Sequence, residues 1–375
     1  MTADFDVIVI GAGAAGASAT YQLTKRGLRV LTLEQFAIGH DRGSTHGHSR
    51  IFRFAYDQVI YARMAMRALE LWRDLERDAG AQLYWPTGML DFGGNDAPKI
   101  NRIEAVMREI NAPFELMDSG AMNSRFPQWR PRDDWKIIFS EFAGIVSPIV
   151  TLEVLIRLAR EHGAKVMQNT PVLEVDLSDP KNPSVKTAHG VFSAEKLVIT
   201  AGAWLPKLVP GLERRFKVQD NLTAFFRPKN LEPFDPEKFP VFIQRDDEQV
   251  YGFPNFGLSG VKVAFHATGE IVDPDVRTVI KDDPRVAGLH KWLEKYIPDA
   301  AGMFMQANEC MYSNTTNDDF VIDFHPASSN TIIASPCSGH GFKFTPILGE
   351  ILADMVQGNA NEFIADQFKI NSVTT

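Results

Sequence analysis

The sequence predicts a two-domain protein of the α/β (α+β) class, with a parallel sheet in one domain and a largely antiparallel sheet in the other. Two observations support this prediction. A strand, a glycine-rich turn, a helix and a second strand follow one another over residues 5–34. Short apolar strands, repeatedly broken by proline, then fill residues 216–315. The first pattern is typical of parallel sheets with crossover helices, and the second of antiparallel sheets.

The N-terminal pattern fits a dinucleotide-binding unit. Val7–Ile10 is an apolar run of strand length, and it ends in the turn Gly11–Gly16, which reads GAGAAG. Ala17–Lys25 has the character of a helix, and Arg29–Leu33 that of a second strand. Since a strand precedes the turn and a helix follows it, a Rossmann-type fold is favoured over a glycine turn used for packing alone.

Each glycine of the turn has a separate physical reason. Gly11 allows a tight turn, Gly13 lets the backbone approach a pyrophosphate, and Gly16 lets the helix pack close to the strand. Ala14 and Ala15 complete the phosphate-facing backbone, where unpaired N–H groups favour an anion. Glu34, at the end of the second strand, can accept a hydrogen bond from a ribose hydroxyl and would repel a 2′-phosphate, which favours FAD or NAD over NADP.

Composition limits the class of protein. The 375 residues are 45% hydrophobic and 23% charged, as expected for a globular protein with room for two domains. A formal net charge of −8 argues against nucleic acid or an anionic membrane as the main partner, and no apolar stretch is long enough to span a bilayer. Two cysteines form no disulfide framework, and the N-terminus lacks signal-peptide character, so we expect a cytoplasmic protein.

The chain is expected to enter the nucleotide domain three times. We assign residues 1–83, 145–215 and 316–375 to this discontinuous domain, and residues 84–144 and 216–315 to a substrate domain. An active site then lies at their junction. The other expected elements are a loop over 39–48, the helices Tyr61–Ala79, Leu152–His162 (N-cap Thr151, stop Gly163), Val286–Tyr296 and Pro346–Gln357, a loop-rich stretch around Pro127–Trp135, and the strands Leu83–Phe92, Lys165–Gln168, Leu197–Thr200, Asp319–Asp323 and Thr331–Ala334.

Five motifs, in the same order and with similar spacing, resemble one family, the flavin-dependent amine oxidases typified by monomeric sarcosine oxidase, with N-methyltryptophan oxidase as a close relative. They are FDVIVIGAGAAG, STHGHSRIFRFAY (Ser44–Tyr56), YGFPNFG (Tyr251–Gly257) with VKVAFH (Val261–His266), ECMYSNT (Glu309–Thr315) and SGHGFKF (Ser338–Phe344). The resemblance covers nearly the whole chain. It implies FAD as cofactor and oxidation of a secondary (N-methyl) amino acid, with sarcosine as the expected substrate and hydrogen peroxide as a product.

The resemblance assigns Cys310 a thioether bond to the flavin. The alternative is a free, buried cysteine that packs as a small apolar residue, and this alternative is preferred for Cys337. Arg53 and Lys343 are assigned to a clamp for the substrate carboxylate, where a guanidinium offers a planar fork and an ammonium a point charge. A surface salt bridge is the ordinary alternative for each of these two cations.

Lys262 alternates along its strand with Val261 and Val263, so its side chain points to the opposite face, into a cavity or into solvent. An exposed lysine fits this alternation equally well. The resemblance places Lys262 over the flavin, where a fixed positive charge promotes the reaction with oxygen. His266 shares the face of Lys262 and resembles the family's active-site histidine.

The remaining candidates surround these groups. Arg50 and Tyr56 join Lys262 and His266 as catalytic candidates, and Tyr251 and Tyr312 are expected to line the substrate pocket. Histidines 40, 46 and 48 lack the ligand set of a metal site, so no metal is expected. Further residues expected to contact the cofactor are Ser44, His46, Ser49, Arg50, Val172, Gly202, Trp204, Gly339, Gly341, Phe342 and Lys343.

Departures from the family pattern leave the amine open. His48 stands where sarcosine oxidases tend to have an acid, Phe54 stands where they have a histidine, and residues 244–247 (QRDD) are unusually polar. A bulkier amine, such as N-methyltryptophan, a cyclic imino acid or a sugar-amine adduct, is therefore the main alternative substrate. An FAD-binding subunit that passes electrons to a partner, and a nicotinamide dehydrogenase, are the alternative functions. A monomer is expected.

Overall fold

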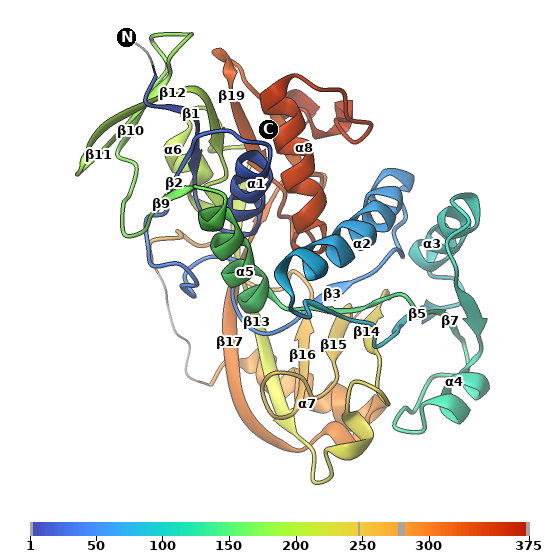
Figure 1. The fold of residues 1–375 in the computed structure, drawn as a ribbon. Coiled ribbons are helices and arrows are strands. Elements are labelled where there is room, and N and C mark those ends of the chain that lie inside the picture. The colour runs from blue at the N-terminus through green and yellow to red at the C-terminus, as the bar shows by residue number, and fades with distance from the viewer. Residues whose placement is uncertain (1–2, 247, 277–281, 373–375) are drawn as a thin grey trace.

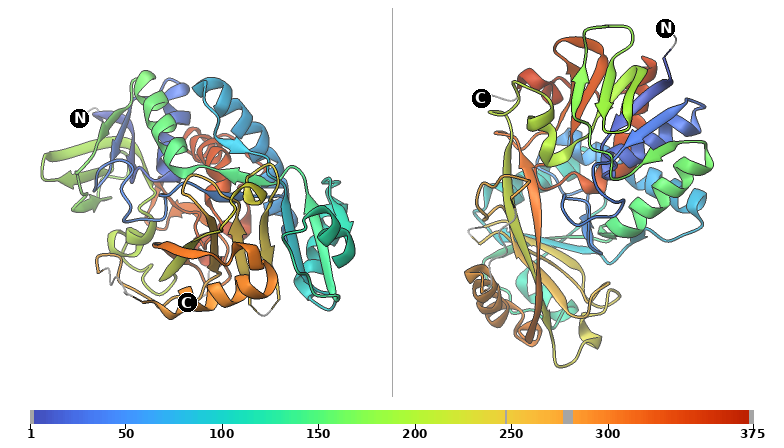
Figure 2. Two further views of the ribbon diagram at one scale, coloured as in Figure 1. Left: turned by 90° about the horizontal axis from the view of Figure 1, so that it is seen from below. Right: turned by 90° about the vertical axis from the view of Figure 1, so that its left-hand side faces the viewer.

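A computed structural model describes residues 3–246, 248–276 and 282–372. Two large sheets and a small three-stranded sheet form the described part of the chain, and helices pack on the outer sides of the large sheets (Figure 1). The right-hand view of Figure 2 shows the half that carries both chain ends above the half built on the second large sheet. The expected α/β class with a second, largely antiparallel sheet is confirmed.

The first sheet has parallel strands at its centre, in the order β9, β2, β1, β12 and β19. An antiparallel hairpin extends β12, and β18 pairs with β19. Central strands are buried on both sides, as expected for a parallel sheet. The strands are β1 (Phe5–Ile10), β2 (Val30–Leu33), β9 (Lys165–Met167), β10 (Glu174–Asp176), β11 (Ser184–Thr187), β12 (Gly190–Ile199), β18 (Val321–His325) and β19 (Ser328–Ser335).

Helices α1 (Ala14–Lys25), α5 (Pro148–Glu161) and α8 (Thr345–Gln357) cover this sheet on one side, and α2 (Val59–Ala79) lies beside α8. Helix α1 lies between α5 and α8, and α2 packs on α8. Their apolar faces form one core, which allows the C-terminal segment to close over the N-terminal unit.

The second sheet has the strand order β17-β13-β16-β15-β14-β5-β7-β6, and all its pairs are antiparallel except β14 with β5. Helix α7 (Pro284–Tyr296) packs on one face, over β13 and β16. The strands are β5 (Met89–Gly94), β6 (Glu115–Met117), β7 (Trp135–Ser140), β13 (Lys217–Arg227), β14 (Val241–Gln244), β15 (Val250–Phe253), β16 (Val261–Phe265) and β17 (Met303–Asn314).

A small sheet joins the two halves. In it β3 (Arg50–Phe52) and β4 (Tyr84–Trp85) both pair with β8 (Gly144–Val146). The remaining helices are α3 (Pro98–Glu109), α4 (Ser119–Arg125) and α6 (Leu205–Leu208), with 3₁₀ turns at Gly202–Trp204, Glu232–Phe234, Pro298–Ala300, Phe342–Phe344, Asp366–Phe368 and Ile370–Ser372.

Several predicted boundaries are wrong. Thr151 is not an N-cap, because α5 already begins at Pro148, whose fixed φ suits the first helical position; Ser147 is the N-cap. Helix α1 begins at Ala14 instead of Ala17, so the second half of the glycine turn is already helical. The predicted strand Leu83–Phe92 is two strands, separated by a turn in which Gly88 adopts a φ of +72°.

The stretch that was expected to be rich in loops, around Pro127–Trp135, is irregular up to the start of β7, and the helices α3 and α4, which were not predicted, precede it. Their apolar positions recur at helical spacing, at Ile100, Ile103 and Met107 in α3, and these side chains are fully buried. The strand before Thr200 is also longer than predicted, because β12 begins at Gly190 with a half-exposed segment that lacks an apolar run.

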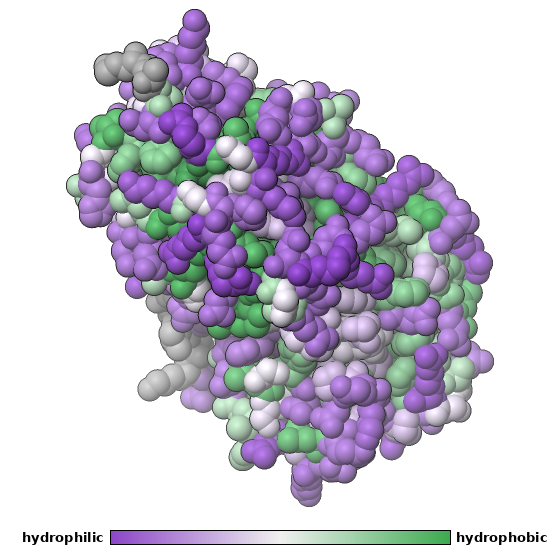
Figure 3. Space-filling model, viewed as in Figure 1, coloured by the Kyte–Doolittle hydropathy of each residue, from purple (hydrophilic) through white to green (hydrophobic). Residues whose placement is uncertain are grey.

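The surface seen in Figure 3 is mostly hydrophilic, with apolar residues scattered over both halves. None of the described helices is long and apolar enough to cross a membrane.

Candidate active site

One large cavity, of about 870 Å³, lies where the two large sheets meet. This volume is in the upper part of the range of about 300–1,000 Å³ that is usual for ligand pockets. The cavity extends from the glycine turn to the antiparallel sheet. The residues predicted from the sequence that line it are Gly11, Gly13, Ala14, Ala15, Glu34, Ser44, His46, Arg50, Arg53, Tyr56, Val172, Gly202, Trp204, Tyr251, Lys262, His266, Cys310, Tyr312, Gly339, Gly341, Phe342 and Lys343.

Two predicted cofactor contacts, Gly16 and Ser49, do not line the cavity. Gly16 is used for packing, because a Cβ atom there would lie 1.9 Å from the carbonyl oxygen of Gly11. Ser49 is buried beside Lys262. Both residues therefore shape the site from behind its walls.

The glycine turn leaves the start of α1 open to an anion. Gly11 has a φ of +93°, which strongly favours glycine, and Gly13 is an N-cap residue without a side chain. The N–H group of Ala14 donates to Oγ1 of Thr45 (3.1 Å). Backbone N–H groups and the positive end of the helix dipole meet here, as a pyrophosphate requires.

Glu34 lies beside the turn at the end of β2. Its carboxylate accepts hydrogen bonds from the N–H groups of Ala12 (2.8 Å) and Phe36 (3.0 Å). These bonds fix the carboxylate at the cavity wall, where it can meet a ribose hydroxyl. This end of the cavity therefore fits the adenosine half of a dinucleotide.

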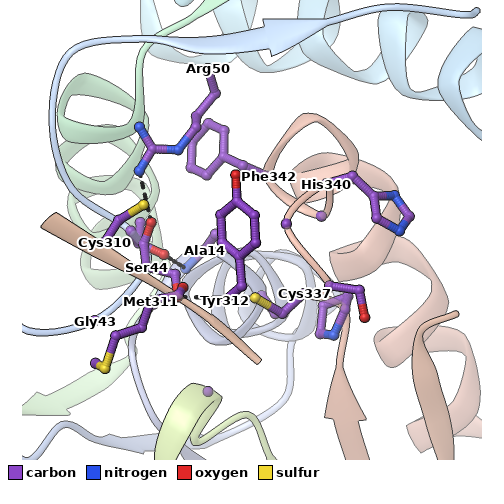
Figure 4. A pocket seen from close by; sticks show the side chains of 18 of the residues that line it. Ala14, Gly43, Ser44, Arg50, Cys310, Met311, Tyr312, Cys337, His340 and Phe342 are labelled. Carbon is purple, nitrogen blue, oxygen red and sulfur yellow. Dashed lines mark hydrogen bonds between the residues drawn. The ribbon is translucent and has the colours of Figure 1, made fainter. Parts of the chain in front are cut away.

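Arg50 and Cys310 face each other farther along the cavity (Figure 4). The guanidinium donates to the carbonyl oxygens of Ser49 and Ser44, both at 2.9 Å. Cys310 lies on β17 opposite Asn221 of β13, and only 9% of it is exposed. Burial raises the pKa of the Cys310 thiol, and the charge of Arg50 acts in the opposite direction.

Cys337 is the other free cysteine, and it lies on the far side of Tyr312 in the view of Figure 4. Its sulfur accepts a hydrogen bond from the backbone N–H of Ser313 (3.3 Å). This contact ties the loop before Ser338 to β17, which is a packing role.

Tyr56 brings the two predicted clamp residues together. The guanidinium of Arg53 lies 3.8 Å from the centre of the Tyr56 ring, and Nζ of Lys343 lies 3.0 Å from the Tyr56 hydroxyl. Arg53 and Lys343 are both buried. Burial lowers the pKa of Lys343 well below its usual value, and the charge of Arg53 adds to this effect.

Arg53 and Lys343 have no carboxylate within ion-pair distance among the residues that the structure describes. Arg53 donates to the carbonyl oxygen of Ala55, and Lys343 to that of His340 (2.6 Å). Cations that are buried without a counter-ion are costly to the fold. Their arrangement around Tyr56 therefore provides a site for an anion.

Lys262 points into the cavity and not into solvent, since only 6% of it is exposed. Its Nζ donates to the carbonyl oxygen (3.1 Å) and the hydroxyl (3.3 Å) of Ser49, and it lies 4.5 Å from the centre of the Phe253 ring. Burial, together with the charge of Arg50, lowers the pKa of Lys262 to about 7. Lys262 can therefore exchange a proton near neutral pH.

His266 and the two tyrosines complete this wall. The hydroxyls of Tyr251 and Tyr312 lie 3.4 Å apart, and the rings of His266 and Tyr312 are 5.8 Å apart. Burial and the surrounding cations, Arg245 first among them, lower the pKa of His266 to about 4. His266 is thus neutral at physiological pH.

The motif Ser338–Phe344 needs its glycines. Gly339 has a φ of +74° and lies against the ring of Tyr312, where a Cβ atom would come within 2.5 Å. A Cβ atom on Gly341 would lie 1.5 Å from the carbonyl oxygen of Pro336. This tight loop places Lys343 at the cavity wall.

Sequence reasoning did not assign several lining residues, among them Tyr61, Lys99, Arg245 and His340. His340 stands in a quoted motif and lies 3.1 Å from the Tyr56 hydroxyl, so the motif itself held the signal. Arg245 stands in the polar segment that departs from the family pattern. No cluster of described residues could hold a metal ion.

Two relatives are similar to this chain over almost their whole length. It is 34% identical to the monomeric sarcosine oxidase of Arthrobacter sp. (strain TE1826), over 98% of this chain and 96% of that protein. It is 31% identical to the N-methyl-L-tryptophan oxidase of Citrobacter koseri, over 99% of both. The resemblance expected from the motifs is confirmed.

Solved structures show the same fold. The L-proline dehydrogenase of P. horikoshii matches with a TM-score of 0.86 at 19% identity, over 98% of this chain and 97% of that one. The open form of NikD, described as an unusual amino acid oxidase, matches with a TM-score of 0.84 at 24% identity, over 98% of both chains.

The family model described as FAD dependent oxidoreductase matches residues 6–355, which span both large sheets and the cavity between them. FAD is therefore the cofactor of this chain, and the expectation of a flavin enzyme is confirmed. The chain belongs to the FAD-dependent oxidoreductase family.

Proposed function

We propose that this chain oxidises a secondary amino acid, with sarcosine or a similar N-methyl amino acid as substrate. The observation that carries the proposal is the pair Arg53 and Lys343, two buried cations that meet at Tyr56 without a carboxylate partner in the described structure. A substrate carboxylate would supply the missing charge. The names of the relatives, sarcosine oxidase and N-methyl-L-tryptophan oxidase, support an amino acid as substrate.

The clamp also orients the substrate. Arg53 can offer two parallel N–H donors, and Lys343 is held by the Tyr56 hydroxyl and the carbonyl oxygen of His340. A carboxylate bound there leaves the amine toward His266, Tyr251 and Tyr312, which line the same cavity. A bound FAD would supply the oxidising chemistry, in which the carbon next to nitrogen would lose a hydride equivalent and oxygen would be reduced to hydrogen peroxide. Water would then hydrolyse the resulting imine to amine and aldehyde.

The charges around the amine favour its neutral form. Arg53 and Lys343 disfavour a further positive charge nearby, so the pKa of the bound amine should lie below its value in water. His266 adds no positive charge at neutral pH, since its pKa is about 4. The bound amine thus presents the lone pair that oxidation requires.

Cys310 is the residue we propose to hold the flavin covalently. It lies on the cavity wall beside Arg50; burial raises the pKa of its thiol, and the charge of Arg50 partly offsets this effect. Lys262 is the residue we propose to promote the oxygen reaction, because its ammonium would stabilise the negative charge that oxygen acquires. Ser49 fixes the position of that ammonium.

The proposal includes the domain division expected from the sequence, with the nucleotide domain over 1–83, 145–215 and 316–375 and the substrate domain over 84–144 and 216–315. Its support is that the strands of the first large sheet fall in the former ranges and those of the second in the latter. We also propose a monomer in the cytoplasm, where Cys310 and Cys337 would stay reduced until flavin binds.

Substitution of Arg53 tests the function directly. The purified chain should release hydrogen peroxide from sarcosine with oxygen as sole acceptor. Arg53→Gln should raise the KM about 10- to 100-fold, because a hydrogen bond between charged groups contributes about 1.5–3 kcal/mol. Arg63→Gln, an exposed position on α2, is the matched control and should behave as the unchanged protein.

Three outcomes would contradict this prediction. An unaltered KM in Arg53→Gln would remove the clamp from the account. Peroxide release only from bulkier amines would replace the substrate. Turnover that needs a partner protein would make the chain an electron-passing subunit.

The pH dependence tests the ionisation of the amine. The rate of anaerobic flavin reduction by sarcosine, followed by stopped-flow absorbance, should rise with pH to a plateau, because only the neutral amine reacts. The same profile should persist in His266→Asn, since His266 is already neutral at those pH values. A rate that does not depend on pH, or a profile that disappears in His266→Asn, would contradict the account.

Removal of Cys310 tests the linkage. Protein precipitated with acid should retain its yellow colour, and Cys310→Ala should release all of it to the supernatant, while Cys337→Ala retains it. Colour that stays with precipitated Cys310→Ala would exclude a thioether at this residue.

Lys262→Met should slow the reaction of the reduced enzyme with oxygen by roughly 10²- to 10³-fold, as does the loss of one stabilising group in an oxyanion site. Flavin reduction by the amine should change far less. In the unchanged protein, the rate constant for the oxygen reaction should fall as pH rises through the pKa of Lys262, because the ammonium then loses its proton. This pKa is about 7, and a bound anion would raise it.

Stopped-flow reoxidation measures this rate constant directly. Lys229→Met, at an exposed position, is the control. Equal slowing of both half-reactions in Lys262→Met would indicate a structural role instead.

A further inference from the structure

Arg245 is a cation of the cavity wall that the proposed function does not use. It follows β14, lines the cavity and has a side chain that is 10% exposed. Its Nε and Nη2 donate to the two carboxylate oxygens of Asp91 at 2.6 and 2.8 Å. Asp91 is 1% exposed and is not a lining residue, so it holds the guanidinium from behind.

This arrangement leaves one edge of the guanidinium for a ligand. Among the hydrogen bonds of the described residues, none engages Nη1 of Arg245. Asp91 is held in the strand β5 by its register with Ile243 of β14, so Arg245 is fixed at the wall. A guanidinium fixed in this way can bind a carboxylate through its end, with Nη1 and Nη2 as donors.

Arg245 belongs to the substrate end of the cavity. Its charge lowers the pKa values of Lys343 and Arg53, in both cases after the larger effect of burial. Burial lowers the pKa of His266 most, and among the surrounding charges Arg245 has the largest effect in the same direction. The three residues surround the proposed substrate, so Arg245 lies within electrostatic reach of it.

Lys99 adds a further cation. It is exposed and still lines the cavity, which places it where the cavity opens to solvent. Within the described residues it has no carboxylate at ion-pair distance; apart from Glu34, the acidic residues that line the cavity are Asp57 and Asp318. Burial raises the pKa of Asp318.

The substrate end thus has cationic hydrogen-bond donors beyond the two that would hold one carboxylate. Arg53 and Lys343 form one anion site, and Arg245 with Lys99 adds a second group of donors on the same cavity. Cations gathered around a cavity favour an anionic ligand over a neutral one of the same shape.

We propose that the amine substrate carries two carboxylates, one held by Arg53 and Lys343 and the second by Arg245 with the help of Lys99. The second carboxylate can stand on the side chain of the N-methyl amino acid or on the nitrogen substituent, because both ends of a short secondary amine can reach a wall of the cavity. This inference rests on the proposed function for the oxidation itself, but not for the binding of the second carboxylate.

The test compares matched substrates. Peroxide release is measured with N-methyl-L-glutamate, its neutral isostere N-methyl-L-glutamine, N-(carboxymethyl)glycine and sarcosine. The kcat/KM for N-methyl-L-glutamate or for N-(carboxymethyl)glycine should be at least about ten times that for N-methyl-L-glutamine. A factor of about ten is what one good hydrogen bond between charged groups contributes. The arm that shows the preference identifies the position of the second carboxylate.

Two variants locate the preference. Lys99→Gln, at an exposed position, should reduce the ratio of kcat/KM for the dicarboxylate substrate to kcat/KM for N-methyl-L-glutamine severalfold. Lys291→Gln, at an exposed position on α7, should leave this ratio unchanged. The double variant Arg245→Met with Asp91→Asn removes both charges of the buried pair, so that no lone charge remains. This double variant should bring the kcat/KM ratio close to one. If the pair serves only the fold, the double variant should change the free energy of unfolding and leave the ratio unchanged.

Binding without turnover separates this inference from the proposed function. Glutarate should raise the melting temperature of the holoenzyme more than butyrate at equal concentration, and the double variant should lose the difference. Absence of amine oxidation with a retained glutarate effect would overturn the function and keep the second site. Equal effects of glutarate and butyrate, with equal kcat/KM for the glutamate and glutamine substrates, would overturn the second site.

Discussion

Side chains along the second large sheet alternate between its two faces, and the whole site depends on this period of two residues. One face packs on α7 through residues such as Val261, Val263 and Leu222. The other face carries Lys262 and Cys310 into the cavity. A shift of one residue in the pairing of β13 with β16 or β17 would turn these polar groups into the core and the valines into the cavity. The apolar core thus sets the register, and the register sets the chemistry.

The cavity gathers positive charge that the protein does not fully neutralise. Arg53, Lys343 and Lys262 are buried, and the structure surrounds them with carbonyl oxygens, hydroxyls and aromatic rings. Such contacts satisfy the N–H donors without cancelling the charge. Anionic ligands then gain more from binding than they would at the surface, because the dielectric constant of the cavity is low. Arg245 differs from these three cations, because Asp91 forms an ion pair with it.

The sequence predicted the parts of the molecule in which local pattern and packing agree. Three features of the N-terminal unit lie as expected: the glycine turn, β1, and Glu34 at the end of β2. Each of them depends on residues that are close together in the sequence. The alternation of Lys262 with its neighbouring valines does not distinguish a cavity from solvent on the opposite face of the strand. The cavity is there because the first large sheet meets the second at this point. Arg245 could not be assigned, because its partner Asp91 lies more than 150 residues away and the two are brought together by the parallel pairing of β14 with β5. Thr151 was assigned to a cap on its residue type, while Pro148 had already begun the helix.

A crystal structure of the holoprotein with a bound, unreactive carboxylate tests the central claim, that the first sheet and the cavity face of the second share one FAD. The account predicts the pyrophosphate at the start of α1, the flavin ring between Cys310 and Lys262, and the carboxylate at Arg53 and Lys343. A flavin ring directed away from the second sheet, with the carboxylate bound elsewhere, would contradict it.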